Sequence, residues 1–128
     1  MDAELFNIGL EARTRVLGEE YVQRAMSSTD SFNHEFQQIL TEYCWGGVWG
    51  RSALTDRQRS LNNLCLLAAL NRGEEFKTHF RAAIGNGCTL DELRDTLIQI
   101  AVYAGIPAGM EAFRIARRVL AEHDTPSA

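Results

Sequence analysis

Apolar residues recur at helical spacing along almost the whole chain, and prolines interrupt the pattern at only two positions, Pro107 and Pro126. A proline inside a helix removes a backbone hydrogen bond and clashes with the preceding turn, so this scarcity permits long helices. The series Phe32, Phe36 and Ile39 illustrates the pattern, because its spacing places the side chains on one helical face. The sequence therefore predicts an all-α fold.

Capping residues and glycines divide the pattern into about six or seven helices, which we expect to pack as a compact bundle. In the first part of the chain, helices are expected over residues 3–16, 19–26 and about 30–43. A fourth helix runs from residue 55 or 56 to 70, and a fifth ends at residues 85–87. The last two helices span residues 89–104 and 107–121. The segment Thr89–Glu92 has the sequence of a capping box, with threonine at the N-cap and glutamate three residues later. The segment Gly85–Gly87 is typical of a helix C-terminus.

Three segments do not follow this simple pattern. The sequence leaves open whether Asn71-Arg72-Gly73 continues the helix that starts at Thr55 or Asp56 toward His79, bends it or ends it. The three glycines and two tryptophans of Cys44–Gly50 predict a loop with large apolar anchors. The tail, residues 123–128, is expected to be frayed.

The composition suits a soluble enzyme or binding protein. A length of 128 residues with 45% hydrophobic content predicts one domain over residues 1–128. A net charge of -4 and a pI near 5.3 argue against a nucleic-acid surface, which needs a basic excess. No apolar run reaches the ~18 residues of a membrane span, and the acidic start lacks a secretory signal. We therefore expect a cytoplasmic protein that binds neither nucleic acid nor membrane.

The cysteines and histidines give no sign of a metal site. Cys44, Cys65 and Cys88 lie far apart and form no C-x-x-C pair, which argues against a disulfide framework and against zinc. The three histidines are dispersed as well, and the chain has no P-loop, dinucleotide fingerprint or EF-hand loop. We expect neither a metal nor a cofactor.

Arg72, Glu75 and His79 are the residues best suited to catalysis. On a continuous helix they fall within about 60° of one another, because each residue advances the helix by about 100°. A guanidinium, a carboxylate and an imidazole on one face, beside an apolar wall, can hold an anion and move a proton without a cofactor. The same spacing is also typical of a solvated face with ion pairs along the helix.

Several sequence blocks, in a fixed order, resemble the carboxymuconolactone decarboxylase family over about residues 5 to 121. The blocks are Tyr43-Cys44-Trp45-Gly46 with Trp49, Asp56-Arg57-Gln58-Arg59-Ser60-Leu61, Ala69-Leu70-Asn71-Arg72, Glu74-Glu75-Phe76 with His79, Arg81-Ala82-Ala83, Asn86-Gly87, Glu92 and Tyr103-Ala104-Gly105-Ile106-Pro107-Ala108. The chain looks most similar to the members that act on 4-carboxymuconolactone. The resemblance implies an AhpD-like all-α fold that assembles as a homo-oligomer, a trimer or hexamer.

The resemblance also implies a reaction: cofactor-independent decarboxylation of 4-carboxymuconolactone to β-ketoadipate enol-lactone, in the protocatechuate branch of the β-ketoadipate pathway. The substrate, a small anionic lactone, is its own electron sink, because the electrons left by CO2 delocalise into the lactone carbonyl. His79 would deliver a proton to carbon, Glu75 would orient it or act as a second acid, and Arg72 would clamp a carboxylate. Further substrate contacts are expected from Arg51, Arg57, Arg59, Trp45 and Trp49, although solvated charge and core packing explain these residues too.

Differences between the chain and the family pattern disfavour one function and leave others open. A peroxidase-like branch carries C-x-x-C-x-x-x-H on the corresponding helix, but its cysteines align with Arg72 and Glu75, which disfavours a peroxidase or disulfide reductase. Gly47 replaces an expected acidic residue, and Gly73 replaces an expected aromatic one. Two alternatives therefore stay open. One is an enzyme of the same fold acting on a different lactone or keto acid, as decarboxylase, hydrolase or isomerase. The other is a non-catalytic oligomer that binds small acids.

Overall fold

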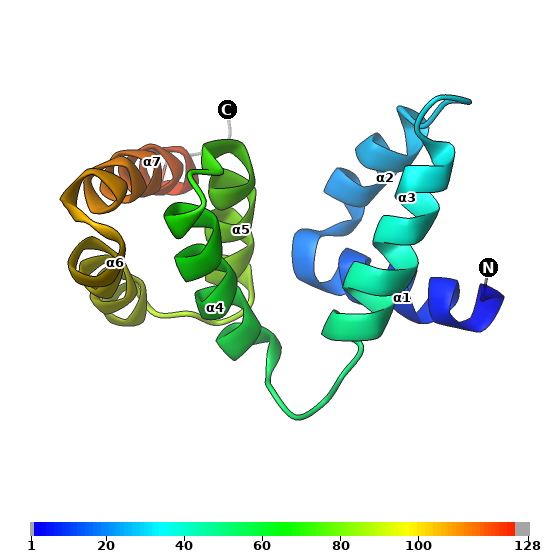
Figure 1. The fold of residues 1–128 in the computed structure, drawn as a ribbon, viewed down its shortest axis with the longest axis horizontal. Helices are drawn as coiled ribbons and strands as arrows, with labels where there is room; N and C mark the ends of the chain where they lie inside the picture. Colours follow the sequence, from blue (N-terminus) through cyan, green and yellow to red (C-terminus); the bar gives the residue numbers. More distant parts are fainter. Residues whose placement is uncertain (1, 125–128) are drawn as a thin grey trace. The chain divides into compact units, whose positions relative to one another are not determined.

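A computed structural model describes residues 2–124 of the chain, and these residues form helices joined by short turns, with no strand among them (Figure 1). The helices are α1 (Ala3–Leu17), α2 (Glu19–Ser27), α3 (His34–Ile39), η1 (Leu40–Trp49), α4 (Asp56–Ala69), α5 (Gly73–Gly85), α6 (Leu90–Ala104) and α7 (Ile106–Asp124). The predicted all-α class is confirmed. The chain divides into two compact units, Met1–Asp56 and Arg57–Ala128, each with buried apolar residues of its own. The single domain over residues 1–128 stays a prediction.

The first unit is built on α1, which packs along η1, a π-helix that continues α3 without a break. The buried apolar residues of this unit are Ala12, Val16, Val22, Trp45 and Trp49. The Asp2 carboxylate accepts the Leu5 backbone N–H at 3.0 Å and so caps the start of α1. Gly18 ends the helix with a φ of 94°, a conformation that glycine adopts without strain.

The glycine-rich segment Cys44–Gly50 does not form the predicted loop, because it lies in the π-helix η1 up to Trp49. Its glycines allow a close helix contact: a Cβ on Gly46 would lie 2.6 Å from the carbonyl oxygen of Leu5 in α1. On the facing helix, a Cβ on Gly9 would lie 1.9 Å from the Thr41 carbonyl oxygen. The loop prediction was wrong because these glycines are needed where two backbones meet, not where the chain turns.

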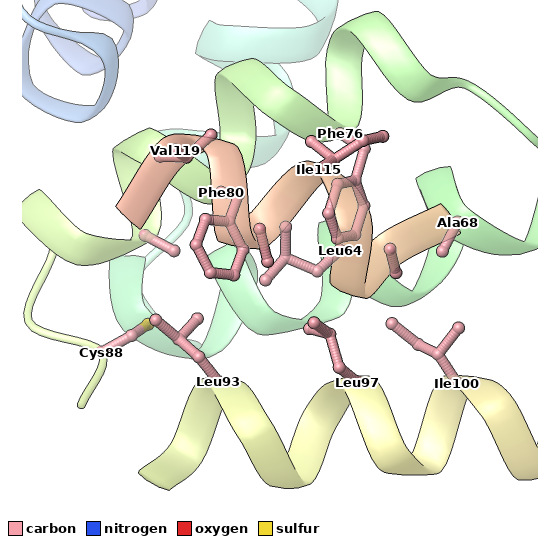
Figure 2. Packing of buried hydrophobic residues seen from close by; sticks show 13 residues of the cluster. Leu64, Ala68, Phe76, Phe80, Cys88, Leu93, Leu97, Ile100, Ile115 and Val119 are labelled. Atoms are coloured by element: carbon pink, nitrogen blue, oxygen red, sulfur yellow. The ribbon is translucent and has the colours of Figure 1, made fainter. Parts of the chain in front are cut away.

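The second unit surrounds one apolar core with α4, α5, α6 and α7 (Figure 2). The buried residues of this core are Leu64, Ala68, Phe76, Phe80, Ala83, Cys88, Leu93, Leu97, Ile100, Ala112, Ile115, Ala116 and Val119. The rings of Phe76 and Phe80 stack one turn apart on α5, with centroids 6.0 Å from each other. The periodic apolar positions of the sequence therefore point inward in this unit, as predicted.

α4 and α5 are separate helices, so the sequence does not form one long helix through His79. The Arg72 N–H donates to the Leu67 carbonyl at 2.9 Å, and the Asn71 N–H donates to the Ala68 carbonyl at 3.1 Å. These two bonds form the Schellman motif that ends a helix. Asn71 takes the required left-handed conformation, with a φ of 59°, which asparagine tolerates better than most residues.

The capping box that opens α6 is confirmed. The Glu92 N–H donates to the Thr89 hydroxyl oxygen at 3.1 Å, and the Thr89 N–H donates to the Glu92 carboxylate at 2.9 Å. The helix stop before it is confirmed as well, since Gly87 follows α5 with a φ of 91°. Local sequence signals thus set the turn between α5 and α6.

α7 begins one residue before Pro107, which lies in the first turn, where a missing N–H costs nothing. The helix continues to Asp124. The fraying expected for residues 123–128 stays a prediction. Residues 125–128, the rest of the predicted tail, lie outside the described part. Within residues 2–124, no helix combines the length and the apolar composition that crossing a membrane requires.

Candidate active site

α5 carries two of the predicted catalytic residues, Glu75 and His79, one turn apart. Glu75 is exposed in the first turn, whereas His79 is half-buried and its Nδ1 atom is shielded from solvent. Burial lowers the pKa of His79 below its ordinary range, and the negative charge of Glu75 opposes this shift. At neutral pH the imidazole is therefore mainly neutral, with one ring nitrogen that donates and one that accepts.

Arg72 does not share the helical face of Glu75 and His79. It is the residue before α5, and its backbone is not helical, with a φ of -100° and a ψ of 74°. The predicted three-residue face was therefore wrong for Arg72, because the left-handed turn at Asn71 separates it from α4 and leaves it outside α5. Glu75 and His79 keep the predicted i,i+4 relation.

A cavity of about 220 Å³ lies where α5 begins, and Arg72 lines it. Its apolar lining includes Leu67, Phe76 and Ile115, and its polar lining comprises Asn71, Arg72 and Glu111. No side chain at the N-cap binds the free N–H groups of the first turn of α5. A guanidinium beside an uncapped helix start suits a carboxylate, because both the charge and the N–H groups favour an anion.

Gly73 leaves space in this cavity. A Cβ at this position would lie 3.5 Å from the Ile115 side chain, which is an ordinary contact. A larger side chain, such as the aromatic residue that the resemblance leads us to expect, would extend along Ile115 and fill part of the cavity. Gly47, the other departure from the pattern, lies in η1, where a Cβ would meet only the Glu42 carbonyl oxygen, at 3.6 Å. Of the two glycines, Gly73 is therefore the one that shapes the cavity beside Arg72.

Arg57 and Arg59 lie on α4 and do not line this cavity. Arg57 forms an ion pair with Glu92, the residue that also caps α6, and this bond lowers the pKa of the Glu92 carboxyl. The pair links the starts of α4 and α6, so the charge of Arg57 is already matched. Arg59 is half-buried. Direct contact of either arginine with a substrate stays a prediction.

Three further predicted substrate contacts, Trp45, Trp49 and Arg51, belong to the first unit. The two indoles stack with ring centroids 5.2 Å apart, and each residue is only 3% exposed, so their main role is in the core. Trp49 and Arg51 also line a cavity of about 440 Å³, beside the ion pair of Arg15 and Asp56, whose N–O distance is 2.7 Å. Their role toward a substrate stays a prediction.

Two residues of the cavity at α5, Asn71 and Glu111, were not selected from the sequence. The signal for Asn71 was present, because asparagine is a common left-handed residue at the end of a helix. Glu111 forms an ion pair with Arg114 along α7 and reaches the cavity only because α7 packs against α5. No local pattern in the sequence reveals that contact.

The second unit thus offers three chemical functions close to one helix. Arg72 and the start of α5 can hold a carboxylate, His79 can exchange a proton, and Glu75 can tune the charge of His79. Within residues 2–124, no group of three or more His, Cys, Asp or Glu side chains is placed to hold a metal ion. This combination suits proton transfer to or from an anionic organic substrate.

Comparison with known families matches residues 34–118 to the carboxymuconolactone decarboxylase family. This chain belongs to that family. The matched region runs from α3 into α7 and includes Arg72, Glu75 and His79. The family to which the sequence blocks pointed is confirmed, and with it the expectation of an AhpD-like helical fold.

Two relatives cover most of the chain. The 4-carboxymuconolactone decarboxylase of Acinetobacter baylyi is 40% identical over 118 residues, which make up 92% of this chain and 88% of that protein. The nitrosuccinic acid decarboxylase npaB of Metarhizium robertsii is 38% identical over 116 residues, or 91% of this chain and 81% of that protein. Both relatives are decarboxylases, which supports the expectation of a carboxy-lyase over that of a peroxidase.

Proposed function

We propose that this family member is a cofactor-independent carboxy-lyase that converts 4-carboxymuconolactone to β-ketoadipate enol-lactone, in the protocatechuate branch of the β-ketoadipate pathway. The observation that carries the proposal is the arrangement around α5: Arg72 and a cavity lie at the start of the helix, and the half-buried His79 lies one turn after Glu75. The 40% identity to the Acinetobacter baylyi enzyme supports the choice of lactone.

The proposed reaction assigns one task to each group. The bond to the departing carboxylate breaks, and its electron pair moves through the ring double bond onto the lactone carbonyl oxygen as CO2 leaves. The imidazolium form of His79 then gives a proton to carbon and becomes neutral imidazole, which takes a proton back from solvent. Arg72 and the start of α5 hold the carboxylate of the acetate arm, which stays on the substrate.

A coupled assay tests this proposal. 4-Carboxymuconolactone is generated in situ, no metal or cofactor is added, and CO2 and enol-lactone are measured together. We expect both products to form at equal rates. Ring opening without CO2 would instead indicate a lactone hydrolase, and binding without turnover would indicate the non-catalytic oligomer that binds small acids. Either result contradicts the proposal.

A second candidate substrate is nitrosuccinate, which the 38% identity to the Metarhizium robertsii enzyme favours. Loss of CO2 from the carbon that bears the nitro group would leave a nitronate, so the nitro group replaces the lactone carbonyl as the electron sink. Protonation of the same carbon then gives 3-nitropropanoate. The demands on Arg72 and His79 are unchanged. CO2 release from nitrosuccinate, and not from the lactone, would select this candidate.

Arg72 allows the carboxylate clamp to be tested separately from the chemistry. Replacing Arg72 by glutamine should raise KM for the lactone about ten-fold, the usual cost of losing a charge-assisted hydrogen bond, with a smaller effect on kcat. Arg118→Gln is the matched control, because Arg118 is an exposed arginine that does not line the cavity. An unchanged KM in folded Arg72→Gln would contradict the clamp.

We also propose that the chain acts as a homo-oligomer, a trimer or hexamer. Large apolar side chains are exposed in both units, among them Phe32, which is 96% exposed, and Tyr103, which is 85% exposed. Exposed apolar surface of this kind is typical of sites that contact other chains. The cytoplasmic location stays a prediction.

A further inference from the structure

A second cavity of the second unit, of about 410 Å³, is lined by none of the residues with proposed catalytic roles. We call it the α6–α7 groove. Its lining includes the buried residues Phe80, Leu93 and Leu97, which meet in the core between α5, α6 and α7 (Figure 2). Leu90, which is 52% exposed, and Phe113, which is 40% exposed, line the groove nearer to solvent. A mainly apolar lining and this volume are typical of small-molecule sites.

Two arginines, Arg94 from α6 and Arg117 from α7, supply the only charges among the groove-lining residues that the structure describes. Arg94 is held by Asp91 at 2.9 Å, but the Asp91 side chain is 90% exposed, so this pair is weak. Arg117 forms no ion pair with the side chains that the structure describes.

The acidic side chains that the structure describes on α7 form no ion pair with Arg117. The positions three and four residues away on α7 are occupied by Phe113, Arg114, Leu120 and Ala121. Among the described acidic side chains of α7, Glu111 pairs with Arg114, and Glu122 pairs with Lys77 and Arg81 of α5. The groove therefore combines an apolar lining with an excess of positive charge, which comes from one arginine on α6 and one on α7.

We propose that the α6–α7 groove binds a small organic anion with an apolar body, of the class of medium-chain or aryl carboxylates. The carboxylate lies between the guanidinium groups of Arg94 and Arg117, which donate charge-assisted hydrogen bonds. The apolar body covers Leu93, Leu97 and Phe113, so that surface now open to water is buried. Neither Arg72 nor His79 lines the groove, and the site is therefore distinct from the candidate active site.

The test is a titration of the ¹⁵N-labelled full-length protein with decanoate, kept below its micelle concentration, and in parallel with decyltrimethylammonium. Decanoate should shift the amides of residues 90–97 and 113–121, whereas the cation of equal chain length should not. Arg117→Gln should weaken decanoate binding about five-fold, in the range of a single charge-assisted contact. Arg118→Gln, a change of an exposed arginine beside it that does not line the groove, should leave the affinity unchanged.

Three results would overturn the proposal. Equal decanoate affinity in Arg117→Gln and Arg118→Gln would show that the charge plays no part. Equal binding of the cation would show an unspecific apolar surface. Shifts of the same amides on dilution of the protein, without any response to decanoate, would show that a second copy of the chain covers the groove. Leu90→Gln is a second test variant. Because Leu90 is half-exposed, this substitution should weaken decanoate binding without unfolding the chain.

Discussion

Replacement of His79 by glutamine is expected to lower the kcat of CO2 release by about 10²- to 10⁴-fold, which is the usual contribution of a general acid or base. Glutamine is close to histidine in size and keeps an N–H donor, but it cannot give up a proton to carbon. His79 is only half-buried, so the variant should keep its fold. The measurements are kcat and KM in the CO2 assay, together with circular dichroism of the same samples.

The other two histidines provide matched controls. His34 on α3 and His123 on α7 are both exposed, and we assign neither a role in the reaction. His34→Gln and His123→Gln should therefore turn over at the rate of the unchanged protein. A folded His79→Gln protein with kcat within about two-fold of that rate would remove His79 from the mechanism.

The pH dependence of the reaction follows from the environment of His79. Burial lowers the pKa of this imidazole, so the imidazolium form predominates only at a pH below the ordinary value of about 6.5. Because the imidazolium form is the proposed donor, kcat should rise as the pH falls through that range and level off below the pKa of His79. Glu75→Gln removes the charge that raises this pKa, so its profile should shift toward more acid pH. A shift toward alkaline pH would contradict the assigned pair.

The features that the sequence predicts well are those that neighbouring residues decide. The capping box of Thr89 and Glu92, the stop at Gly87 and the i,i+4 relation of Glu75 and His79 each involve a few consecutive residues. Their hydrogen bonds or spacing are set by local backbone geometry, which the residue types reveal directly. The helical spacing of the proposed catalytic pair on α5 could therefore be predicted without knowledge of the rest of the chain.

The features that the sequence predicts poorly depend on a partner far along the chain. The cavity beside Arg72 exists because α7 brings Glu111 and Ile115 to the start of α5, about forty residues away. The lowered pKa of His79 also comes from burial by tertiary packing, whereas its sequence neighbours alone suggest a near-neutral group. The break before α5 had a local signal in Asn71, but the apolar run before it favoured a continuous helix.

Replacement of Gly9 by alanine is expected to destabilise the first unit by about 3 kcal/mol or more, although alanine alone favours a helix interior by roughly 0.5–1 kcal/mol over glycine. The added Cβ would lie 1.9 Å from the backbone carbonyl oxygen of Thr41, which cannot rotate away as a flexible side chain can. α1 and η1 would have to separate, which would also disturb the stacked Trp45 and Trp49. Urea unfolding followed by tryptophan fluorescence measures this effect, because both tryptophans of the chain lie in the first unit.

Gly47→Ala is the matched control for Gly9→Ala, because it adds the same methyl group within the same unit. Its Cβ would lie 3.6 Å from the Glu42 carbonyl oxygen, an ordinary contact, so the change should be neutral or slightly stabilising. Opposite effects of the two substitutions would show that close backbone contact, and not helix propensity, decides which glycines this unit needs. If Gly9→Ala proved as stable as Gly47→Ala, α1 and η1 could not pack as closely as described, and the correction of the Cys44–Gly50 loop to a helix contact would lose its physical basis.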